Sequence, residues 1–408
     1  MDKFTDHVGP EFRTAFPKWA DLNLYLAQRA TPEFPLQRAR QQLIMGDLLS
    51  RMNGMTDDWH VVGSLTLHCR PDPADGWPDG FRPEHSPVDP VYVMPRAAYD
   101  LDLYNARLLD APPDEYEAAT VARIQAVAPS RQQRLDGAVG LGGLVRYSSR
   151  RIEGGEPGHT VFWVSAQPVD DRRGALGTFG VGSPVEFEVD VKAPRMIKQA
   201  GPPERSLRSI VGTELPGVRP IMPYLAPKAN QLVDKTVTVA IQPPIVDGQP
   251  QPRFKDLWDT HYLLRTCQFE RTQVERALAQ NWHWEDHDAT GLPEPYRLWG
   301  DAPLREGEIA VAWEHGVERF RGREPQLQRY PSHEQMTGLL REFADGIRDP
   351  SNELWLPSAG WQQSPRQEAV DQLGRAFVPE GAAAGTPLRP SSARRTTAAR
   401  GAAPDIGR

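Results

Sequence analysis

Two acidic residues at period two are the first candidates for chemistry in this chain. Residues 99–103 read YDLDL, so acidic and apolar residues alternate. On a β-strand this alternation points Asp100 and Asp102 out of one face. Neighbouring carboxylates repel each other unless a cation lies between them, and divalent metals accept carboxylate oxygens as ligands. The pair therefore indicates a divalent metal site that faces phosphate.

A turn of small residues upstream fits the other half of such a site. Residues 59–70 read WHVVGSLTLHCR, in which Gly63 and Ser64 interrupt a short apolar segment. A turn without bulky side chains lets backbone N–H groups and a hydroxyl approach phosphate oxygens closely. Gly63 and Ser64 are therefore predicted to bind the phosphates of a nucleotide.

Gly-Ser followed by Asp-x-Asp resembles the signature of nucleotidyltransferases with a DNA polymerase β-like fold. The fuller pattern, VVGSLTLHCR and then RAAYDLDLY, resembles the AbiEii/AbiGii toxin family over about residues 43–264. The resemblance implies a mixed α/β catalytic domain, Mg²⁺-dependent transfer from a nucleoside triphosphate, and often a paired antitoxin. In that family the two motifs usually lie about one hairpin apart, whereas a Pro-rich excursion, residues 70–96, separates them here. Such an excursion is tolerable because closure entropy grows slowly with loop length.

A second acidic strand is predicted downstream. Residues 184–192 read PVEFEVDVK, with Glu186, Glu188 and Asp190 on one face. The resemblance implies a third carboxylate on the strand beside Asp-x-Asp, where it helps to bind metal and can accept the proton of the attacking hydroxyl. Asp190 is the candidate for this role and Glu188 the alternative. A half-buried strand that turns its acids to water is the competing structural interpretation.

Two later segments also resemble the family, in residues 223–239 and 253–264. The matching positions are Asp234-Lys235 and then Arg253, Lys255, Asp256 and Asp259. Lys235 can neutralise the triphosphate and its leaving pyrophosphate. Asp256 and Asp259 lie three residues apart, hence on one helical face, where they can orient Lys235 or accept the attacking hydroxyl. A surface ion pair and an acid near a helix N-terminus are the structural alternatives.

The expected fold class is α+β, a mixed nucleotidyltransferase sheet flanked by helices. Apolar residues at three- and four-residue steps predict helix in the N-terminal part, with Arg38, Arg40 and Arg51 on a solvated face; contact with nucleic acid is the alternative. The predicted regions are an N-terminal helical region (1–58), a nucleotidyltransferase core (59–265) with the insertion 70–96, a mainly helical C-terminal region (266–378) and a disordered tail (379–408).

Composition narrows the class of protein. The chain has 408 residues, of which 39% are hydrophobic and 25% charged, as in ordinary globular proteins. No run approaches the length of a membrane span, the N-terminus lacks a signal-peptide core, and Cys69 and Cys267 are too few for a disulfide framework. These features predict a cytoplasmic protein without a membrane partner. The net charge of −7 argues against broad, non-specific nucleic-acid binding.

The sequence thus predicts a Mg²⁺-dependent enzyme that moves a nucleoside monophosphate from a nucleoside triphosphate to an acceptor hydroxyl. By resemblance the acceptor is an RNA such as tRNA, the role is that of the toxin in a toxin–antitoxin or phage-defence system, and a cognate antitoxin is the protein partner. The predicted catalytic residues are Asp100, Asp102, Asp190 and Asp256, of which the first three bind metal, and the predicted nucleotide-binding residues are Gly63, Ser64 and Lys235. The alternative is a catalytically inactive nucleotide-binding or protein-interaction module on the same fold.

Overall fold

The computed structural model describes most of the chain between residues 7 and 363. The described ranges are 7–30, 35–54, 56–70, 98–130, 139–152, 157–169, 183–197, 201–206, 209–211, 214–240, 245–246, 249–250, 254–282, 333–357 and 359–363. All of them belong to one compact unit, Met1–Ser364. The predicted insertion, apart from Arg70, and the predicted tail lie outside the described residues.

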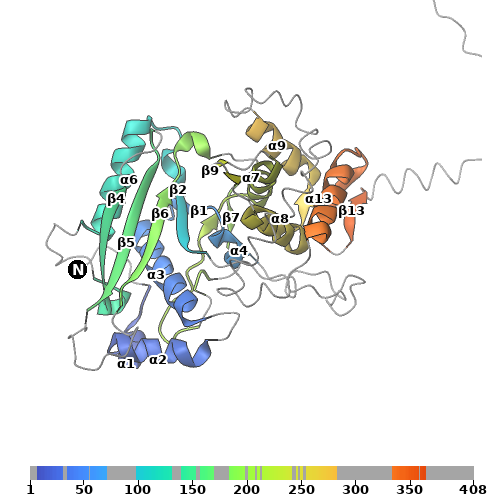
Figure 1. Cartoon of the computed structure of the whole chain (residues 1–408). Coiled ribbons are helices and arrows are strands. Elements are labelled where there is room, and N and C mark those ends of the chain that lie inside the picture. Colours follow the sequence, from blue (N-terminus) through green and yellow to red (C-terminus); the bar gives the residue numbers. More distant parts are fainter. Residues whose placement is uncertain are drawn as a thin grey trace, which may run out of the picture. The chain divides into compact units, whose positions relative to one another are not determined.

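An eight-stranded mixed sheet is the largest element of the described structure (Figure 1). Its strands, in spatial order, are β3 (Val139–Gly140), β4 (Val145–Ile152), β5 (Thr160–Pro168), β6 (Val185–Val191), β2 (Asp100–Asn105), β1 (Trp59–Val61), β8 (Tyr224–Leu225) and β7 (Glu204–Arg205). Strands β2 and β6 are parallel, as are β1 and β8, while every other pair is antiparallel. The parallel pair β2–β6 brings the two acidic strands side by side.

One face of this sheet is covered by helices. They are α3 (Leu36–Asn53) and α6 (Pro113–Val127), while α1 (Pro10–Ala15) and α2 (Trp19–Arg29) add residues to the same core. Helix α3 contacts β6 and β1, and α6 contacts β4 and β5. The alternating apolar residues of the strands, such as Leu101 on β2, Phe162 on β5 and Val189 on β6, are buried in the same core as these helices. The acidic residues of β2 and β6 therefore point to the opposite face.

Helix α3 is buried on nearly all sides, which corrects one prediction. Arg38 and Arg51 are only 6% and 4% exposed, so they do not lie on a solvated helix face. The guanidinium of Arg38 contacts the ring of His68 at 2.9 Å. The prediction was wrong because it assumed that one face of α3 meets water, whereas the sheet, α2 and α6 all pack around this helix.

A second apolar core is built from helices that follow the sheet in the chain. They are α7 (Lys228–Ala240), α8 (Phe254–Thr266), α9 (Arg271–Trp282) and α13 (His333–Ile347). A three-stranded sheet joins them, consisting of β11 (Phe269–Glu270), β12 (Asn352–Leu356) and β13 (Gly360–Gln363). Trp355 of β12 is fully buried and donates its indole N–H to the Leu264 carbonyl. The described C-terminal part thus contains strands as well as helices.

The short helix α4 (Leu65–Cys69), which follows Gly63 and Ser64, contributes to both cores. Leu65 packs in the core beneath the sheet, whereas Leu67 packs with α7 and α8. The Tyr262 hydroxyl of α8 donates to the Leu67 carbonyl at 3.2 Å. The Gly-Ser turn is thereby placed where the sheet meets α7 and α8.

The remaining short elements are η2 (Ala106–Leu108), η3 (Leu141–Gly143), η4 (Pro194–Met196), β9 (Ile245–Val246) and β10 (Gln249–Pro250). A mixed sheet flanked by helices confirms the predicted α+β class. Within the described ranges, no helix combines the length and the apolar character that crossing a membrane requires.

Candidate active site

Carboxylates from two neighbouring strands form the centre of the site. Asp100 on β2 lies in register with Glu188 on β6, and Asp102 lies in register with Asp190. Parallel strands in register place such side chains about 5 Å apart at the backbone. Two rows of acids therefore cross from β2 to β6 on the face that the helices leave open.

The Gly63–Ser64 turn lies against these acids, across the pairing of β1 with β2. Gly63 has φ +67°, and a Cβ at this position would lie 1.9 Å from Oδ2 of Asp102. Ser64 Oγ lies 3.5 Å from Oδ1 of Asp100, at the outer limit of a hydrogen bond. The Asp102 carboxylate occupies the place that a side chain at position 63 would need, so this close approach of β2 to the turn requires glycine.

The turn is held in place by hydrogen bonds to α7. Gln231 Nε2 donates to the Gly63 carbonyl at 2.7 Å. The Thr66 hydroxyl lies 2.7 Å from both that carbonyl and Gln231 Oε1. Arg70 also donates to Gln231 Oε1, at 3.2 Å, and pairs with Glu204. These contacts fix the position of α7 relative to the Gly-Ser turn.

Helix α7 also carries Lys235, which is held by two acids of α8. Lys235 Nζ lies 2.7 Å from Oδ1 of Asp256 and 3.2 Å from Oδ2 of Asp259. The side chains are 16%, 9% and 0% exposed respectively, so the cluster is largely shielded from water. Asp256 and Asp259 share one helical face, as their spacing predicts. Arg253 lies outside the described residues.

Asp190 accepts hydrogen bonds at both of its oxygens. His159 Nε2 lies 2.7 Å from Oδ1, and Lys192 Nζ lies 2.5 Å from Oδ2. The same ammonium group lies 3.3 Å from Oδ1 of Asp102. Lys192 therefore bridges the carboxylates of neighbouring strands. In the part of the chain that the structure describes, no three acidic, histidine or cysteine side chains already surround one point as a closed metal site.

The clustering of charge changes the acidity of these groups. Burial, together with the carboxylates of Asp100 and Asp190, raises the pKa of Asp102 to about 6, although the ammonium groups of Lys192 and Lys235 act against this rise. Burial and the same acidic neighbours also raise the pKa of Glu188. The influence of Lys235 on Asp102 means that α7 brings its positive charge toward the acids.

The structure thus brings Gly63, Ser64, Asp100, Asp102 and Asp190 together, with Lys235 held by Asp256 nearby. Sequence reasoning missed four residues that shape the site, namely Thr66, His159, Lys192 and Gln231. Lys192 could have been found, because it lies two residues after Asp190, directly after the end of β6. Thr66 lies two residues after Ser64 and bonds locally to the Gly63 carbonyl, whereas His159 and Gln231 reach the site through tertiary contacts that no sequence pattern indicates.

A mixed sheet with a small-residue turn beside an Asp-x-Asp strand is the arrangement of a nucleotidyltransferase. The family model described as nucleotidyl transferase AbiEii toxin, type IV toxin–antitoxin system, matches residues 94–337, more than half of the chain. The chain therefore belongs to the AbiEii family of nucleotidyltransferase toxins. A search of curated proteins finds no match. The Gly-Ser turn lies upstream of the matched residues, so its assignment to the site depends on its contact with Asp102.

Gly63→Ala tests whether the contact with Asp102 needs an unsubstituted turn. We expect a loss of about 2 kcal/mol in the free energy of unfolding, from left-handed strain and displacement of the carboxylate. Because a small displacement at a reacting centre is costly, nucleotide transfer should fall about a hundredfold. The control is Gly142→Ala, where φ is +60° and the nearest atom, Val8 Cγ1, lies 3.2 Å from the added Cβ. Equal activity losses in the two variants would contradict the prediction.

Asp102→Asn is expected to stabilise the metal-free protein at pH 7.5. The folded-state pKa of Asp102 is raised from 3.8 to about 6, so the ionised carboxylate costs free energy above pH 6. Removing the charge should add about 1 to 3 kcal/mol, because the net rise of the pKa already includes the favourable interaction with Lys192. The gain should shrink as pH falls through 6, and vanish below the unfolded pKa, where both states are protonated. Thermal unfolding in a chelator from pH 7.5 to 4.5 measures it, with exposed Asp345→Asn as control; a gain independent of pH would count against it.

Proposed function

We propose that this protein moves a nucleoside monophosphate from a nucleoside triphosphate to an acceptor hydroxyl with the help of Mg²⁺. The observation that carries the proposal is the contact of Gly63 with Asp102, which places a turn without a side chain against a row of acids. Membership of the AbiEii family supports transfer of a nucleotidyl group as the chemistry. The residues that bind each part of the substrate follow from this arrangement.

Asp100 and Asp102 are proposed to bind Mg²⁺. The fit is supported by two carboxylates on one strand face and by their register with Glu188 and Asp190 on β6, which gathers four acids where a cation would bind. Mg²⁺ commonly takes one or two carboxylates and completes its shell with substrate phosphates and water, so a closed protein site is unnecessary. When bound, the metal neutralises charge that develops on the phosphate oxygens. The ammonium group of Lys192 pairs with Asp102, so it has to move away from this carboxylate when the metal binds.

Gly63, Ser64 and Lys235 are proposed to hold the triphosphate. The backbone N–H groups of the turn and the Ser64 hydroxyl donate hydrogen bonds, while Lys235 supplies a positive charge near the leaving pyrophosphate. Asp256 and Asp259 orient this lysine, because both lie within ion-pair distance of its ammonium group. For Asp256, this position favours the orienting role over direct contact with the acceptor.

Asp190 is proposed as the third carboxylate. It lies in register with Asp102 and accepts hydrogen bonds from His159 and Lys192, which hold its carboxylate in one orientation. In this position it can bind metal or accept the proton of the attacking hydroxyl. Glu188, in register with Asp100, is the alternative for the same role.

The proposed acceptor is the end of an RNA such as tRNA, and the proposed protein partner is a cognate antitoxin. The type IV toxin–antitoxin description of the family supports the partner and the toxic role, and a cytoplasmic site of action follows from an RNA acceptor. Growth arrest by RNA modification would also suit phage defence.

The test is incubation of the protein with Mg²⁺, total RNA and each α-labelled nucleoside triphosphate in turn. Label incorporated into RNA with stoichiometric release of pyrophosphate is the expected result, and the nucleotide that reacts identifies the base. Absence of transfer with all four nucleotides, despite measurable triphosphate binding, would reject the proposal.

One observation favours a second function, a nucleotide-binding module without catalysis. Both oxygens of Asp190 are already bonded by Lys192 and His159. If Lys192 stays bound to Asp190 and Asp102, the protein would bind a triphosphate but release no pyrophosphate. Pyrophosphate release in the same assay distinguishes the two functions.

A further inference from the structure

A row of side chains continues from the acids across the open face of the sheet. Glu188 on β6 is in register with Trp163 on β5, and Trp163 is in register with Arg150 on β4. Since Asp100 is the partner of Glu188, the row runs from Asp100 to Arg150 over four strands. At about 5 Å per strand, the Trp163 backbone lies about 10 Å from that of Asp100. The row is thus within one or two nucleotides of the proposed reacting centre.

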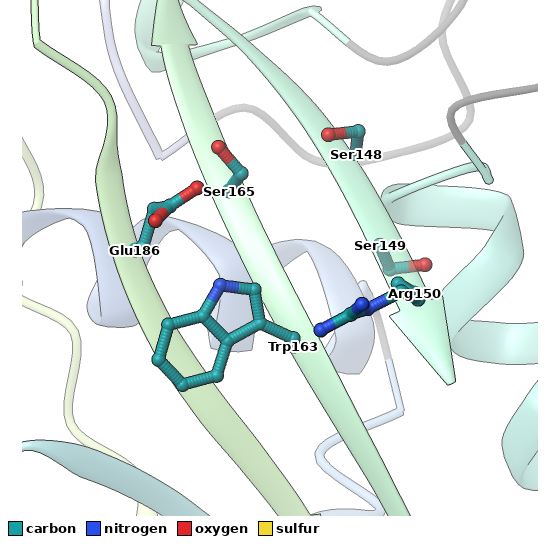
Figure 2. Close-up of a pocket in the computed structure, with 6 residues that line it drawn as sticks. All are labelled: Ser148, Ser149, Arg150, Trp163, Ser165 and Glu186. Atoms are coloured by element: carbon teal, nitrogen blue, oxygen red, sulfur yellow. The ribbon is translucent and has the colours of Figure 1, made fainter. Parts of the chain in front are cut away.

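A shallow hollow of about 200 Å³ lies over this part of the sheet. Figure 2 shows its lining residues on β4, β5 and β6, with the guanidinium of Arg150 pointing toward Trp163. The lining consists of Ser148, Ser149, Arg150, Trp163, Ser165 and Glu186. An indole surrounded by hydroxyls, a guanidinium and a carboxylate is a mixed surface that offers one flat apolar face and several polar contacts.

Trp163 and Arg150 are available to a ligand. Trp163 is half-buried and Arg150 is exposed, although most aromatic side chains of this sheet, such as Phe162 and Tyr147, are buried. Among the residues that the structure describes, no side-chain hydrogen bond or ion pair is found for Trp163 or Arg150. The next residue, Arg151, points to the other face and pairs with Glu117. The two side chains are therefore not explained by packing or by internal ion pairs.

The geometry of phosphoryl transfer indicates what this hollow receives. Attack on the α-phosphate is in line, so the incoming hydroxyl and the leaving pyrophosphate lie on opposite sides. The proposed triphosphate contacts, Gly63 and Ser64, lie beyond β2 on the β1 side of the acids. The acceptor must then approach from the β6 and β5 side, which leads over Trp163.

We propose that the hollow binds an unpaired nucleotide of the RNA acceptor, with its base stacked on Trp163 and a backbone phosphate paired with Arg150. The proposal rests on the nucleotidyltransferase function above and specifies the acceptor as single-stranded RNA. Stacking on an indole suits any base, because every base has a flat π-face. The hydroxyls of Ser148 and Ser165 and the carboxylate of Glu186 can bond to base edges, which are accessible only in an unpaired strand. A base-paired helix cannot present a base in this way.

The test is the affinity of the protein for a fluorescein-labelled RNA dodecamer without self-pairing, measured by anisotropy in the absence of Mg²⁺ and nucleotide. Trp163→Ala should weaken binding about tenfold or more, and Trp163→Phe should restore most of the loss. Arg150→Ala should weaken binding severalfold and reduce the slope of log Kd against log salt by about 0.7. A duplex of the same length should bind more weakly than the single strand.

The matched control is Arg151→Ala, which removes the same charge from the same strand on the other face. It should leave RNA affinity and the salt slope unchanged. If Trp163→Ala and Arg150→Ala bind RNA like the parent, the inference is overturned. The same result would be obtained if this face bound a protein instead of RNA. Triphosphate binding, measured separately, should be the same in all these variants. A parent that binds RNA through Trp163 but transfers no nucleotide would instead refute the proposed function.

Discussion

Replacing both Asp100 and Asp102 with asparagine is expected to lower nucleotide transfer at least about a thousandfold. The two carboxylates share one strand face beside the Gly63 turn, and the proposed metal takes its protein oxygens from them. Asparagine keeps the size of each side chain but removes the negative charge that attracts Mg²⁺. Label incorporation into RNA at saturating triphosphate measures the effect, and growth inhibition after induced expression provides an independent readout.

The control for this variant is Asp345→Asn, which removes an exposed carboxylate of α13 and should leave the transfer rate unchanged. Folding is not expected to suffer in the active-site variant, because the removed charge of Asp100 repels both Asp102 and Glu188. Transfer or toxicity that survives the double substitution would show that these acids do not bind the catalytic metal.

Replacing Lys235 with methionine is expected to reduce both activity and stability. The ammonium neutralises Asp256 and Asp259, of which Asp259 is fully buried, so its loss leaves carboxylates without a partner in a shielded site. Breaking a buried pair in this way costs about 3 to 5 kcal/mol of unfolding free energy. Transfer should fall about a hundredfold with a higher KM for the triphosphate, since the lysine is proposed to contact its phosphates. Chemical denaturation and steady-state kinetics measure the two effects.

A triple variant separates the two roles of Lys235. Lys235→Met combined with Asp256→Asn and Asp259→Asn removes the unpaired charges, so most of the lost stability should return while transfer remains low. Lys228→Met, at the beginning of the same helix, is the control for loss of a positive charge on α7. Recovery of transfer together with stability would mean that Lys235 acts only on folding.

Local patterns in the sequence were sufficient for the parts of the site that a single strand or helix determines. Alternation at period two placed Asp100 and Asp102 on one face of β2 and did the same for Glu188 and Asp190 on β6. Spacing of three residues placed Asp256 and Asp259 on one face of α8. These inferences succeed because the direction of a side chain depends on its own backbone geometry.

Burial and strand pairing could not be predicted from such local patterns. Arg38 and Arg51 were assigned to solvent because the pattern of α3 does not reveal that the sheet, α2 and α6 surround it. The C-terminal region was predicted to be mainly helical, so the strands β12 and β13, which carry Trp355 and Trp361, were missed; strands of five and four residues are too short for a clear period. For α3 and for the pairing of β11 with β12, the partner that determines the environment lies far away in the sequence.

The sequence by itself determined which acids share a face and which family the chain belongs to, and it indicated the Gly-Ser turn as the proposed phosphate contact. Only the tertiary structure decided that Gly63 lies against Asp102, that Lys192 and His159 hold Asp190, and that Trp163 and Arg150 extend the row of acids. The physical reason is that residue type and local period are encoded along the chain. Register between strands is instead chosen by the packing of the whole sheet on its core.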